Sequence, residues 1–239
     1  YSIDGGPTMV AFASSVDEAG SQTYTLEGGA AFTLNDPMLV DGTVLTNDLA
    51  TFSTALAGTG GQLTLTLTAS TNGGSEAFAF QTLRISAGGL EPQRVAFDMV
   101  ESGSERLNSY TNIFEGAFSS AGDGFQKYQR GVSSSIPFAV LDDSLSIFPG
   151  DSLGIIKEGN TDEFFGATDT VNGDNSGPVT ATWVFDITGG TDLVLSVDMG
   201  AMGDFESDDF FEWTYSIDGG PTMVAFASSV DEAGSQTYT

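Results

Sequence analysis

The sequence contains no cysteine and no histidine among its 239 residues. Without cysteine the chain forms neither disulfides nor thiolate metal sites, and it tolerates an oxidising exterior without wrong pairing. Without histidine it lacks the base of Ser-His-Asp and Cys-His catalysis and the usual ligand of hydrolytic zinc sites. These two absences argue against the common forms of enzymatic hydrolysis.

Basic residues are also scarce, since six lysines and arginines stand against 33 acidic residues, for a formal net charge of −27. Nucleic acids and anionic membranes both attract basic surfaces, so we expect neither as a partner. No apolar run approaches the roughly 18 residues of a membrane span, so membrane insertion is not expected. The acidity is either a solvated surface or a surface suited to multivalent cations.

Hydrophobic alternation with period two runs through the chain. In 205-FESDDFFEWTYSIDGGP the side chains of Phe211, Trp213 and Tyr215 share one face, and a turn follows at Asp218. The stretch 62-QLTLTLTAS alternates leucine with threonine in the same way. Such half-buried strands favour an all-β protein, and no stretch has convincing helical periodicity.

Further strands are expected on both sides of the Gly189-Gly190 turn and in 76-EAFAFQTLRIS. In the latter, strict alternation predicts Phe78 and Phe80 on one face, with Leu83 and Ile85 on the other. A long surface loop is expected at 168-TDTVNGDNSGPVT. Weaker candidate strands are 8-TMVAFAS, 30-AAFTL, 95-VAFDMV, 125-FQKYQRG, 136-IPFAVL and 153-LGIIKEG. Together they predict a jelly-roll-like antiparallel β-sandwich.

Residues 1–25 are identical to residues 215–239, so equivalent positions are 214 residues apart. Tyr1 lies in the middle of a strand in the second copy, and a domain rarely begins inside a strand. We therefore expect a window on a tandem array, covering one repeat and 25 residues of the next. An engineered duplication or permutation, and a natural exchanged segment, are the alternatives.

The glycine- and proline-bearing stretch 86-SAGGLEPQR predicts a linker at 87–93. On this hypothesis residues 1–86 are the C-terminal part of one sandwich repeat, and residues 94–239 are the N-terminal part of the next. The two parts either close on each other as in a circular permutant or exchange strands with a neighbouring repeat or chain. One sheet position cannot hold both copies of the 25-residue segment.

Acidic side chains are concentrated in two segments that are candidate calcium sites. The first holds Asp204, Glu206, Asp208 and Asp209, with Glu212 close behind, and the second holds Asp169 and Asp174 beside two asparagines. Calcium prefers six to eight oxygen ligands, and clustered carboxylates repel one another unless a cation or solvent relieves them. Solvated loops are the alternative for both, because neither segment has the spacing of an EF-hand.

Catalysis and sugar binding are two further functions that the residues bring into question. Glu206, Asp208 and Glu212 are superficially similar to the carboxylate ladder of jelly-roll glucanases. On a strand, however, Glu206 and Glu212 are about 20 Å apart, whereas a retaining glycosidase needs about 5–5.5 Å, so we predict no enzyme. A sugar-binding platform or core packing are the alternatives for the aromatic residues Tyr110, Phe114, Phe164, Phe165 and Phe210.

Several phrases carry a resemblance to a known class of domain: 164-FFGATD, 48-DLATFSTALAGTGGQLTLTLTAS, 76-EAFAFQTLRI and the stretch from Trp183 to Gly220. Together they resemble a jelly-roll accessory or repeat domain of large secreted bacterial surface proteins, found beside lamin-tail, nuclease and calcium-binding repeat modules. The resemblance implies a non-catalytic, extracellular, calcium-stabilised domain. It departs at the closing strand, where Gln81 and Thr82 replace the usual acidic or amide residues.

The sequence therefore predicts a non-catalytic structural repeat of an extracellular bacterial surface protein or filament. It is expected to self-associate through β-strand complementation or tandem stacking, with Ca²⁺ as a stabilising ion. Its partners would be neighbouring repeats or chains. The alternative is a carbohydrate-binding adhesin module whose partner is a polysaccharide.

Overall fold

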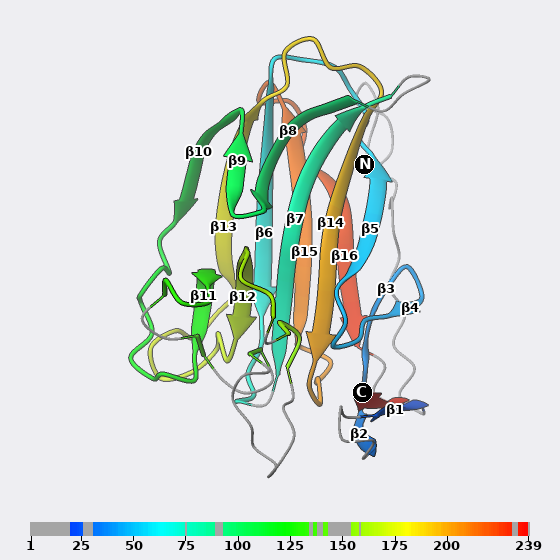
Figure 1. Ribbon diagram of the computed structural model, residues 1–239, viewed down its shortest axis with the longest axis vertical. Helices are drawn as coiled ribbons and strands as arrows, with labels where there is room; N and C mark the ends of the chain where they lie inside the picture. Colours follow the sequence, from blue (N-terminus) through cyan, green and yellow to red (C-terminus); the bar gives the residue numbers. More distant parts are fainter. Residues whose placement is uncertain are drawn as a thin grey trace.

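The computed structural model describes residues 20–25, 31–74, 76–88, 93–133, 136–137, 141–142, 154–157, 159–230 and 234–238. Two antiparallel sheets of seven strands each pack face to face, so the predicted all-β sandwich is confirmed (Figure 1). The strands are β1 (Gly20–Thr25), β2 (Ala31–Asn35), β3 (Met38–Val40), β4 (Thr43–Val44), β5 (Ala50–Ala55), β6 (Gln62–Ser70), β7 (Ala77–Ala87), β8 (Gln93–Val100), β9 (Gly103–Glu105), β10 (Leu107–Asn112), β11 (Gly124–Gln129), β12 (Glu163–Thr168), β13 (Val179–Asp186), β14 (Leu193–Met202), β15 (Phe210–Ile217), β16 (Met223–Val230) and β17 (Gly234–Tyr238).

The two sheets are named here after their long central strands. The β6 sheet has the order β10-β13-β6-β15-β16-β3-β4. The β7 sheet has the order β11-β12-β7-β14-β5, with β8 paired to β7 and β9 paired to β8. The chain crosses between the sheets from β5 to β6 to β7 and again from β12 through β15, so strands that are consecutive in the sequence lie in opposite layers.

The long strands form where one face of the alternation can be buried. In β6 the side chains of Leu63, Leu65 and Leu67 are fully buried, and the threonines between them lie on the other face. Strands β13 and β15 show the same alternation, with Trp183 and Trp213 fully buried. These inner faces form the core, because apolar side chains of both sheets meet between the layers.

Aromatic rings form the centre of this core. Phe80 of β7 contacts Trp213 of β15 edge to face at 5.5 Å between ring centroids, and Trp213 lies 5.2 Å from Trp183. Phe165 of β12 contacts Trp183 in turn, at 5.4 Å. Each edge-to-face pair adds about 0.5–1.5 kcal/mol beyond the area it buries. The rings therefore fasten the two sheets together along the middle of the sandwich.

The prediction that strict alternation continues along β7 is wrong. Phe78, Phe80, Leu83 and Ile85 all belong to the one core between the sheets, whereas strict alternation places the last two on the opposite face. The pairing of β14 with β7 shifts register between Ser196 and Asp198, and Thr82 has a φ of 56°. The extra residue of this bulge reverses the alternation, so that both halves of β7 face the core.

Replacing Thr82 by glycine is expected to stabilise the protein. A left-handed conformation costs a residue with a Cβ roughly 1–2 kcal/mol. Glycine avoids this cost, but the larger conformational entropy that glycine loses on folding offsets part of the gain in stability. We expect a net gain of about 1 kcal/mol, which raises the melting temperature by roughly 2–4 °C. The matched control, Thr66→Gly at an ordinary position of β6, is expected to lower it; a lower melting temperature for Thr82→Gly would contradict the assignment of strain.

The duplicated segment has a clear place in the sandwich at its C-terminal copy. Tyr215–Ile217 completes β15, and Met223–Val230 forms β16 between β15 and β3. The equivalent residues of the first copy, up to residue 19, lie outside the described residues. Both sheets contain strands from residues 38–86 and strands from residues 94–230. Strand β7 of the first part pairs with β8 of the second across the predicted linker at 87–93.

The structure contains some of the weaker candidate strands and lacks others within the residues it describes. Strands are present at 30-AAFTL, 95-VAFDMV and 125-FQKYQRG, as β2, β8 and β11. Within the described parts of 136–141 and 153–159 no strand forms, and an isolated bridge joins Asp142 to Ile156. The candidate at residues 8–14 lies outside the described residues. The long loop predicted at 168–180 is confirmed between β12 and β13.

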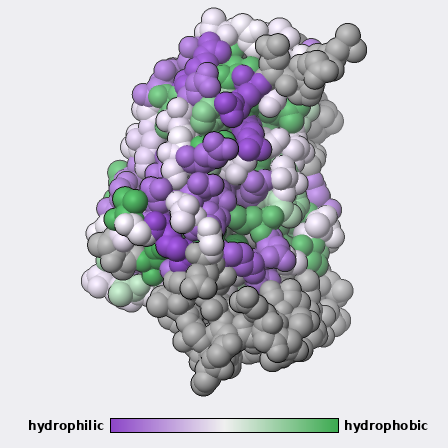
Figure 2. Space-filling model, in the orientation of Figure 1, coloured by the Kyte–Doolittle hydropathy of each residue, from purple (hydrophilic) through white to green (hydrophobic). Residues whose placement is uncertain are grey.

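The outer surface is largely polar. Figure 2 shows hydrophilic side chains along the face that the β7 sheet presents in this view, with smaller hydrophobic areas between them. Within the described ranges, no helical stretch has the length and hydrophobicity that a membrane-spanning helix requires.

Candidate functional site

Three loops meet at the end of the sandwich where β14 finishes, at the lower end in Figure 1. They are the β6–β7 loop, the β12–β13 loop and the β14–β15 loop. The β6–β7 loop lies between the other two, because the Thr71 N–H donates to Thr170 Oγ1 (2.9 Å) and the Asn72 N–H donates to Asp209 Oδ1 (3.1 Å). This arrangement brings both acidic segments to the same end of the fold.

Three carboxylates from two of these loops form the acidic cluster. One oxygen from each of Glu76, Glu206 and Asp209 lies within 4.8 Å of the others. Glu76 is 3% exposed and Asp209 is 2% exposed, whereas Glu206 is at the surface. Backbone N–H groups of Gly73 and Glu206 donate to Glu76 Oε2 and Asp209 Oδ2 at 2.8 and 2.7 Å, so both buried carboxylates are held in fixed positions.

The acidic cluster changes the proton affinity of its members. Burial raises the pKa of Glu76 far above its usual range, and the negative charges of Asp209 and Glu206 raise it further. Burial also raises the pKa of Asp209, against the lowering effect of its backbone hydrogen bonds. Neighbouring carboxylates in such a site either retain a proton or bind a cation. The acidic cluster can therefore hold a proton or a divalent cation.

The remaining predicted ligands of the first acidic segment lie close to the acidic cluster. Asp208 Oδ1 accepts a hydrogen bond from the Asn72 side chain at 3.2 Å, on the exposed side of the loop. Asp204 is exposed as a residue, yet partial burial of its carboxyl raises its pKa, and the charge of Glu206 adds to the effect. Asp208 thus shares Asn72 with Asp209, and Asp204 is within the electrostatic reach of Glu206, but neither belongs to the three carboxylates of the acidic cluster.

The second acidic segment does not join the acidic cluster. Asp174 Oδ2 accepts hydrogen bonds from the backbone N–H and the hydroxyl of Ser119, and these bonds lower its pKa. Asp169 lies near Asp123, and its pKa is raised by partial burial and by that neighbouring charge. The two predicted segments therefore form separate groups of carboxylates at one end of the sandwich.

The sequence pattern alone does not single out Glu76. It lies at the start of a strand-like stretch, more than 120 positions from its partners in the β14–β15 loop. The only local signal is that an acidic residue immediately precedes a fully buried run, since residues 77–81 are all buried. Its role depends on the pairing of Ala77 with Met202, which local sequence patterns do not reveal.

A second candidate site is the set of strands β1, β17 and β2, each of which pairs with the other two. Strands β1 and β17 are copies of one sequence and run parallel, with Gly20 opposite Gly234. Both pair antiparallel with β2 in the same register, so that Ser21 and Ser235 both lie opposite Asn35. Strand β2 therefore accepts either copy in the same alignment.

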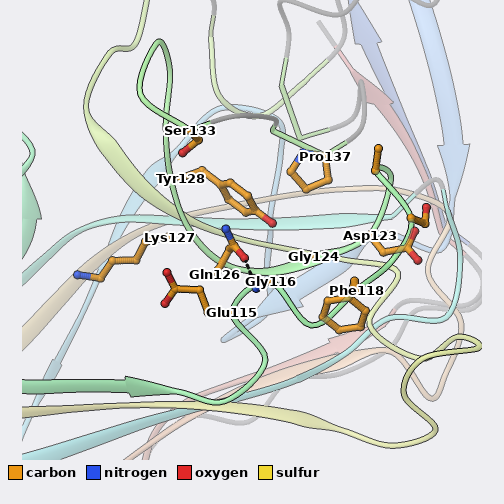
Figure 3. A pocket seen from close by; sticks show the side chains of 12 residues that line it. Glu115, Gly116, Phe118, Asp123, Gly124, Gln126, Lys127, Tyr128, Ser133 and Pro137 are labelled. Atoms are coloured by element: carbon orange, nitrogen blue, oxygen red, sulfur yellow. Dashed lines mark hydrogen bonds between the residues drawn. The ribbon is translucent and has the colours of Figure 1, made fainter.

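A polar cavity of about 360 Å³ lies between the β10–β11 loop and β11 (Figure 3). Its lining includes the side chains of Glu115 and Asp123, together with Phe118 and Tyr128, whereas the Lys127 side chain points away from it. The Gly116 N–H donates to Gln126 Oε1 at 2.7 Å, which ties the loop to the strand. The cavity thus combines carboxylates, an amide and aromatic rings.

Two of the five aromatic residues considered for a sugar-binding platform belong to the core instead. Phe164 and Phe165 are fully buried on opposite faces of β12, one in the main core and the other in a smaller cluster on the outer face of the β7 sheet. Leu141, Ile155 and Ile156 cover that outer face. Tyr110 and Phe114 are partly buried against the main core. For Phe164 and Phe165 the alternative of core packing is correct.

The fold and these sites define an acidic two-sheet β-sandwich protein with a carboxylate cluster at one end and two copies of one strand paired with β2. No protein-family model, curated protein or solved structure matches the chain.

Proposed function

We propose that this chain is a non-catalytic structural repeat of an extracellular bacterial surface protein or filament. It self-associates by β-strand complementation between neighbouring repeats or chains, and calcium stabilises it. The observation that carries the proposal is the common register of β1 and β17 on β2, in which Gln22 and Gln236 both lie opposite Leu34.

Strand β17 is suited to exchange between copies. Strand β1 is joined to β2 by residues 26–30 alone, whereas β17 reaches β2 from the far end of the chain. A two-stranded hairpin is marginal in water, and a third strand adds the pairing that it lacks. Because β17 and β1 have the same sequence, a β17 from the next repeat or another chain fits β2 equally well.

The position of β2 connects this pairing to the sandwich. Leu34 packs against the apolar cluster on the outer face of the β7 sheet, and β3 follows β2 after two residues. Strand β16 ends at Val230, and three residues separate it from β17. A β17 that binds the β2 of another copy would therefore join two sandwiches through short connections, as a repeat array or filament requires.

Calcium stabilisation is proposed for the acidic cluster. Glu76 and Asp209 are buried beside Glu206 in a chain with a large excess of negative charge. A divalent cation would offset their repulsion, and the exposed Asp204 and Asp208 lie beside them as additional oxygen donors.

Self-association is tested by sedimentation and electron microscopy of the full chain over a range of concentrations. The proposal predicts oligomers or filaments whose size increases with concentration, because strand exchange between chains is a mass-action process. Discrete monomers under all conditions would contradict it.

A carbohydrate-binding adhesin module is the second candidate, and the cavity beside β11 favours it. Carboxylates and Gln126 line this cavity together with Phe118, and polar groups around an aromatic ring are a common way to bind a polyhydroxylated ligand. A glycan array with the wild-type chain and Phe118→Ala tests it. Binding that Phe118→Ala abolishes would favour this candidate over a purely structural role.

A further inference from the structure

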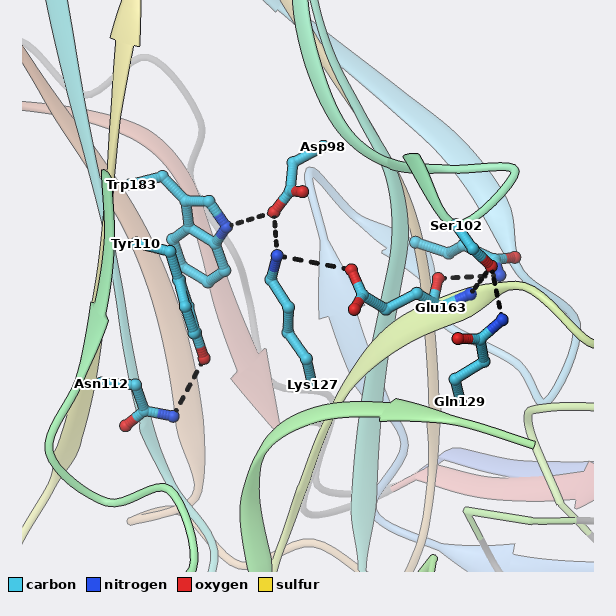
Figure 4. A network of polar contacts seen from close by, with 9 residues as sticks. Asp98, Ser102, Tyr110, Asn112, Lys127, Gln129, Glu163 and Trp183 are labelled. Atoms are coloured by element: carbon cyan, nitrogen blue, oxygen red, sulfur yellow. Dashed lines mark hydrogen bonds and ion pairs between the residues drawn. The ribbon is translucent and has the colours of Figure 1, made fainter. Parts of the chain in front are cut away.

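Lys127 lies between two carboxylates inside the sandwich (Figure 4). Its Nζ is 2.5 Å from Asp98 Oδ2 and 3.4 Å from Glu163 Oε2. The Asp98 side chain is 2% exposed and the Lys127 side chain 16%, while Glu163 is 30% exposed. An amine, a buried carboxyl and a second carboxyl are therefore in contact where water has little access.

The strand pairing explains why a lysine points inward. Lys127 of β11 lies opposite Phe165 of β12, and directly opposite residues share one face of a sheet. Phe165 packs against Trp183 of the other sheet, so Lys127 also faces the space between the sheets. Glu163 is two residues before Phe165 and lies on the same face.

Asp98 reaches the same place from β8. Strands β8 and β12 both pair with β7, β8 along Leu83–Ala87 and β12 along Ala77–Phe80. The end of β8 therefore comes close to the start of β12, and the Asp98 carboxyl meets Lys127 between them. Three strands that are separated in the sequence thus bring the three groups together.

Aromatic groups of the β6 sheet enclose the contact. The Trp183 Nε1–H donates to Asp98 Oδ2 at 2.8 Å, and Lys127 Nζ lies 4.7 Å from the centre of the Tyr110 ring. Figure 4 shows Lys127 extending between Asp98 and Glu163, with the Trp183 indole directed at the Asp98 carboxyl. Burial of this ion pair carries a desolvation cost, which a neutral amide in its place would not carry.

We propose that Lys127 and Asp98 condense to form an intramolecular isopeptide bond, with Glu163 as the general acid and base. The Lys127 Nζ, once it has lost a proton, attacks the Asp98 Cγ and forms a C–N bond. One C–O bond of the carboxyl breaks, and that oxygen leaves as water with two protons that came from Nζ. The ammonium and the carboxylate thus become an amide and one water molecule, without any oxidant or other reactant.

Each neighbouring group has a defined part in this condensation. Contact between Nζ and the carboxyl supplies the proximity that amide formation otherwise lacks in water. The Trp183 N–H stabilises the negative charge that develops on Asp98 Oδ2 when the carbon becomes tetrahedral. Glu163 takes a proton from Nζ and transfers it to the leaving oxygen. Burial raises the pKa of Glu163 against the lowering effect of Lys127, which suits a group that must both accept and release a proton.

The bond would fasten the edge strand β11 to β8 covalently. A cross-link between distant strands restricts the unfolded chain and resists mechanical extension. It does not depend on strand exchange, so its presence or absence leaves the proposed self-association open to separate test.

Intact-mass spectrometry of the purified full chain tests this inference, before and after refolding and prolonged incubation. The expected mass is lower than that of the sequence by one water molecule, and proteolysis is expected to yield a branched peptide that joins Lys127 to Asp98. A wild-type chain that keeps the full sequence mass would overturn the proposal.

Four variants identify the bond and its catalyst. Lys127→Arg keeps the charge but is expected to retain the full mass; if it still loses water, dehydration occurs elsewhere and the proposal is overturned. Asp98→Asn is expected to lose ammonia in place of water. Glu163→Gln is expected to slow the condensation at least tenfold after refolding, and an unchanged rate would exclude Glu163 as the proton carrier. Glu105→Gln, at an exposed carboxylate on β9, is the matched control and should react as the wild type does.

Discussion

A chain shortened to end at Val230 is expected to remain monomeric at concentrations where the full chain associates. This variant keeps every strand of both sheets and removes only β17. Because the core is intact, the free energy of unfolding should change by less than about 1 kcal/mol, so the melting temperature should shift by no more than roughly 4 °C. Sedimentation velocity and a thermal melt of the two chains measure both quantities.

Deletion of residues 1–25 is the matched control for this truncation. It removes β1, the other copy of the same strand, but leaves β17 and β2 in place. Association should persist in this control, because β17 then has an unflanked β2 to bind in a neighbouring chain. If the chain that ends at Val230 associates like the full chain, β17 is not the strand that joins copies.

Glu76→Gln, in the acidic cluster, is expected to change how the melting temperature responds to calcium and to pH. For wild type, calcium at about 100 times its Kd would stabilise the fold by about 2.7 kcal/mol, or roughly 5–10 °C in melting temperature. Glutamine keeps the size of Glu76 and an oxygen for the Gly73 N–H, but it removes the negative charge. The variant is therefore expected to lose most of the calcium response.

Without calcium the pH dependence has the opposite sign from that of an ordinary ion pair. The pKa of Glu76 is raised in the folded state, so the stability it contributes is fully present below its unfolded pKa of about 4.3. That stability is lost as the pH rises toward the folded value, because ionisation then occurs first in the unfolded chain. In chelator, the wild-type melting temperature should fall from pH 5 to pH 8, whereas that of Glu76→Gln should fall less and be higher at pH 8.

Glu212→Gln is the control for both measurements, because it makes the same substitution at a neighbouring carboxylate outside the acidic cluster. It should keep the wild-type response to calcium and pH. A full calcium response in Glu76→Gln would exclude Glu76 as a ligand. A lower melting temperature for Glu76→Gln in chelator at pH 8 would show that its charge does not destabilise the fold.

The sequence was sufficient to predict the sandwich and its main strands. Strands β6, β13 and β15 each bury one face, and such burial leaves a period of two that can be read directly, as in Leu63, Leu65 and Leu67. The bulge at Thr82 could not be predicted in this way. It arises from the register between β7 and β14, which is set by residues more than 100 positions apart.

The candidate sites were only partly predictable for the same reason. The segment containing Glu206 and Asp209 is conspicuous in the sequence, but Glu76 joins it only because β7 and β14 are paired. The contact of Lys127 with Asp98 likewise requires strands β8, β11 and β12 to be assembled. The sequence does not reveal that Phe164 and Phe165 are buried on opposite faces of β12. The residues that cover the outer face of the β7 sheet come from another part of the chain.

The most direct test of strand exchange mixes two single-cysteine chains, which the absence of native cysteine makes unambiguous. One chain carries Asn35→Cys on β2 and the other carries Ser235→Cys on β17, at positions that lie opposite each other. Directly opposite residues have Cβ atoms about 4.5–5.5 Å apart, so a small adjustment permits a disulfide.

Under mild oxidation, the account predicts a disulfide-linked heterodimer of the two chains. The yield should be lower when Ser235→Cys is combined with Thr33→Cys, two residues out of register. A disulfide that forms only when both cysteines are in one chain, and never between the mixed chains, would contradict self-association through β17 and β2.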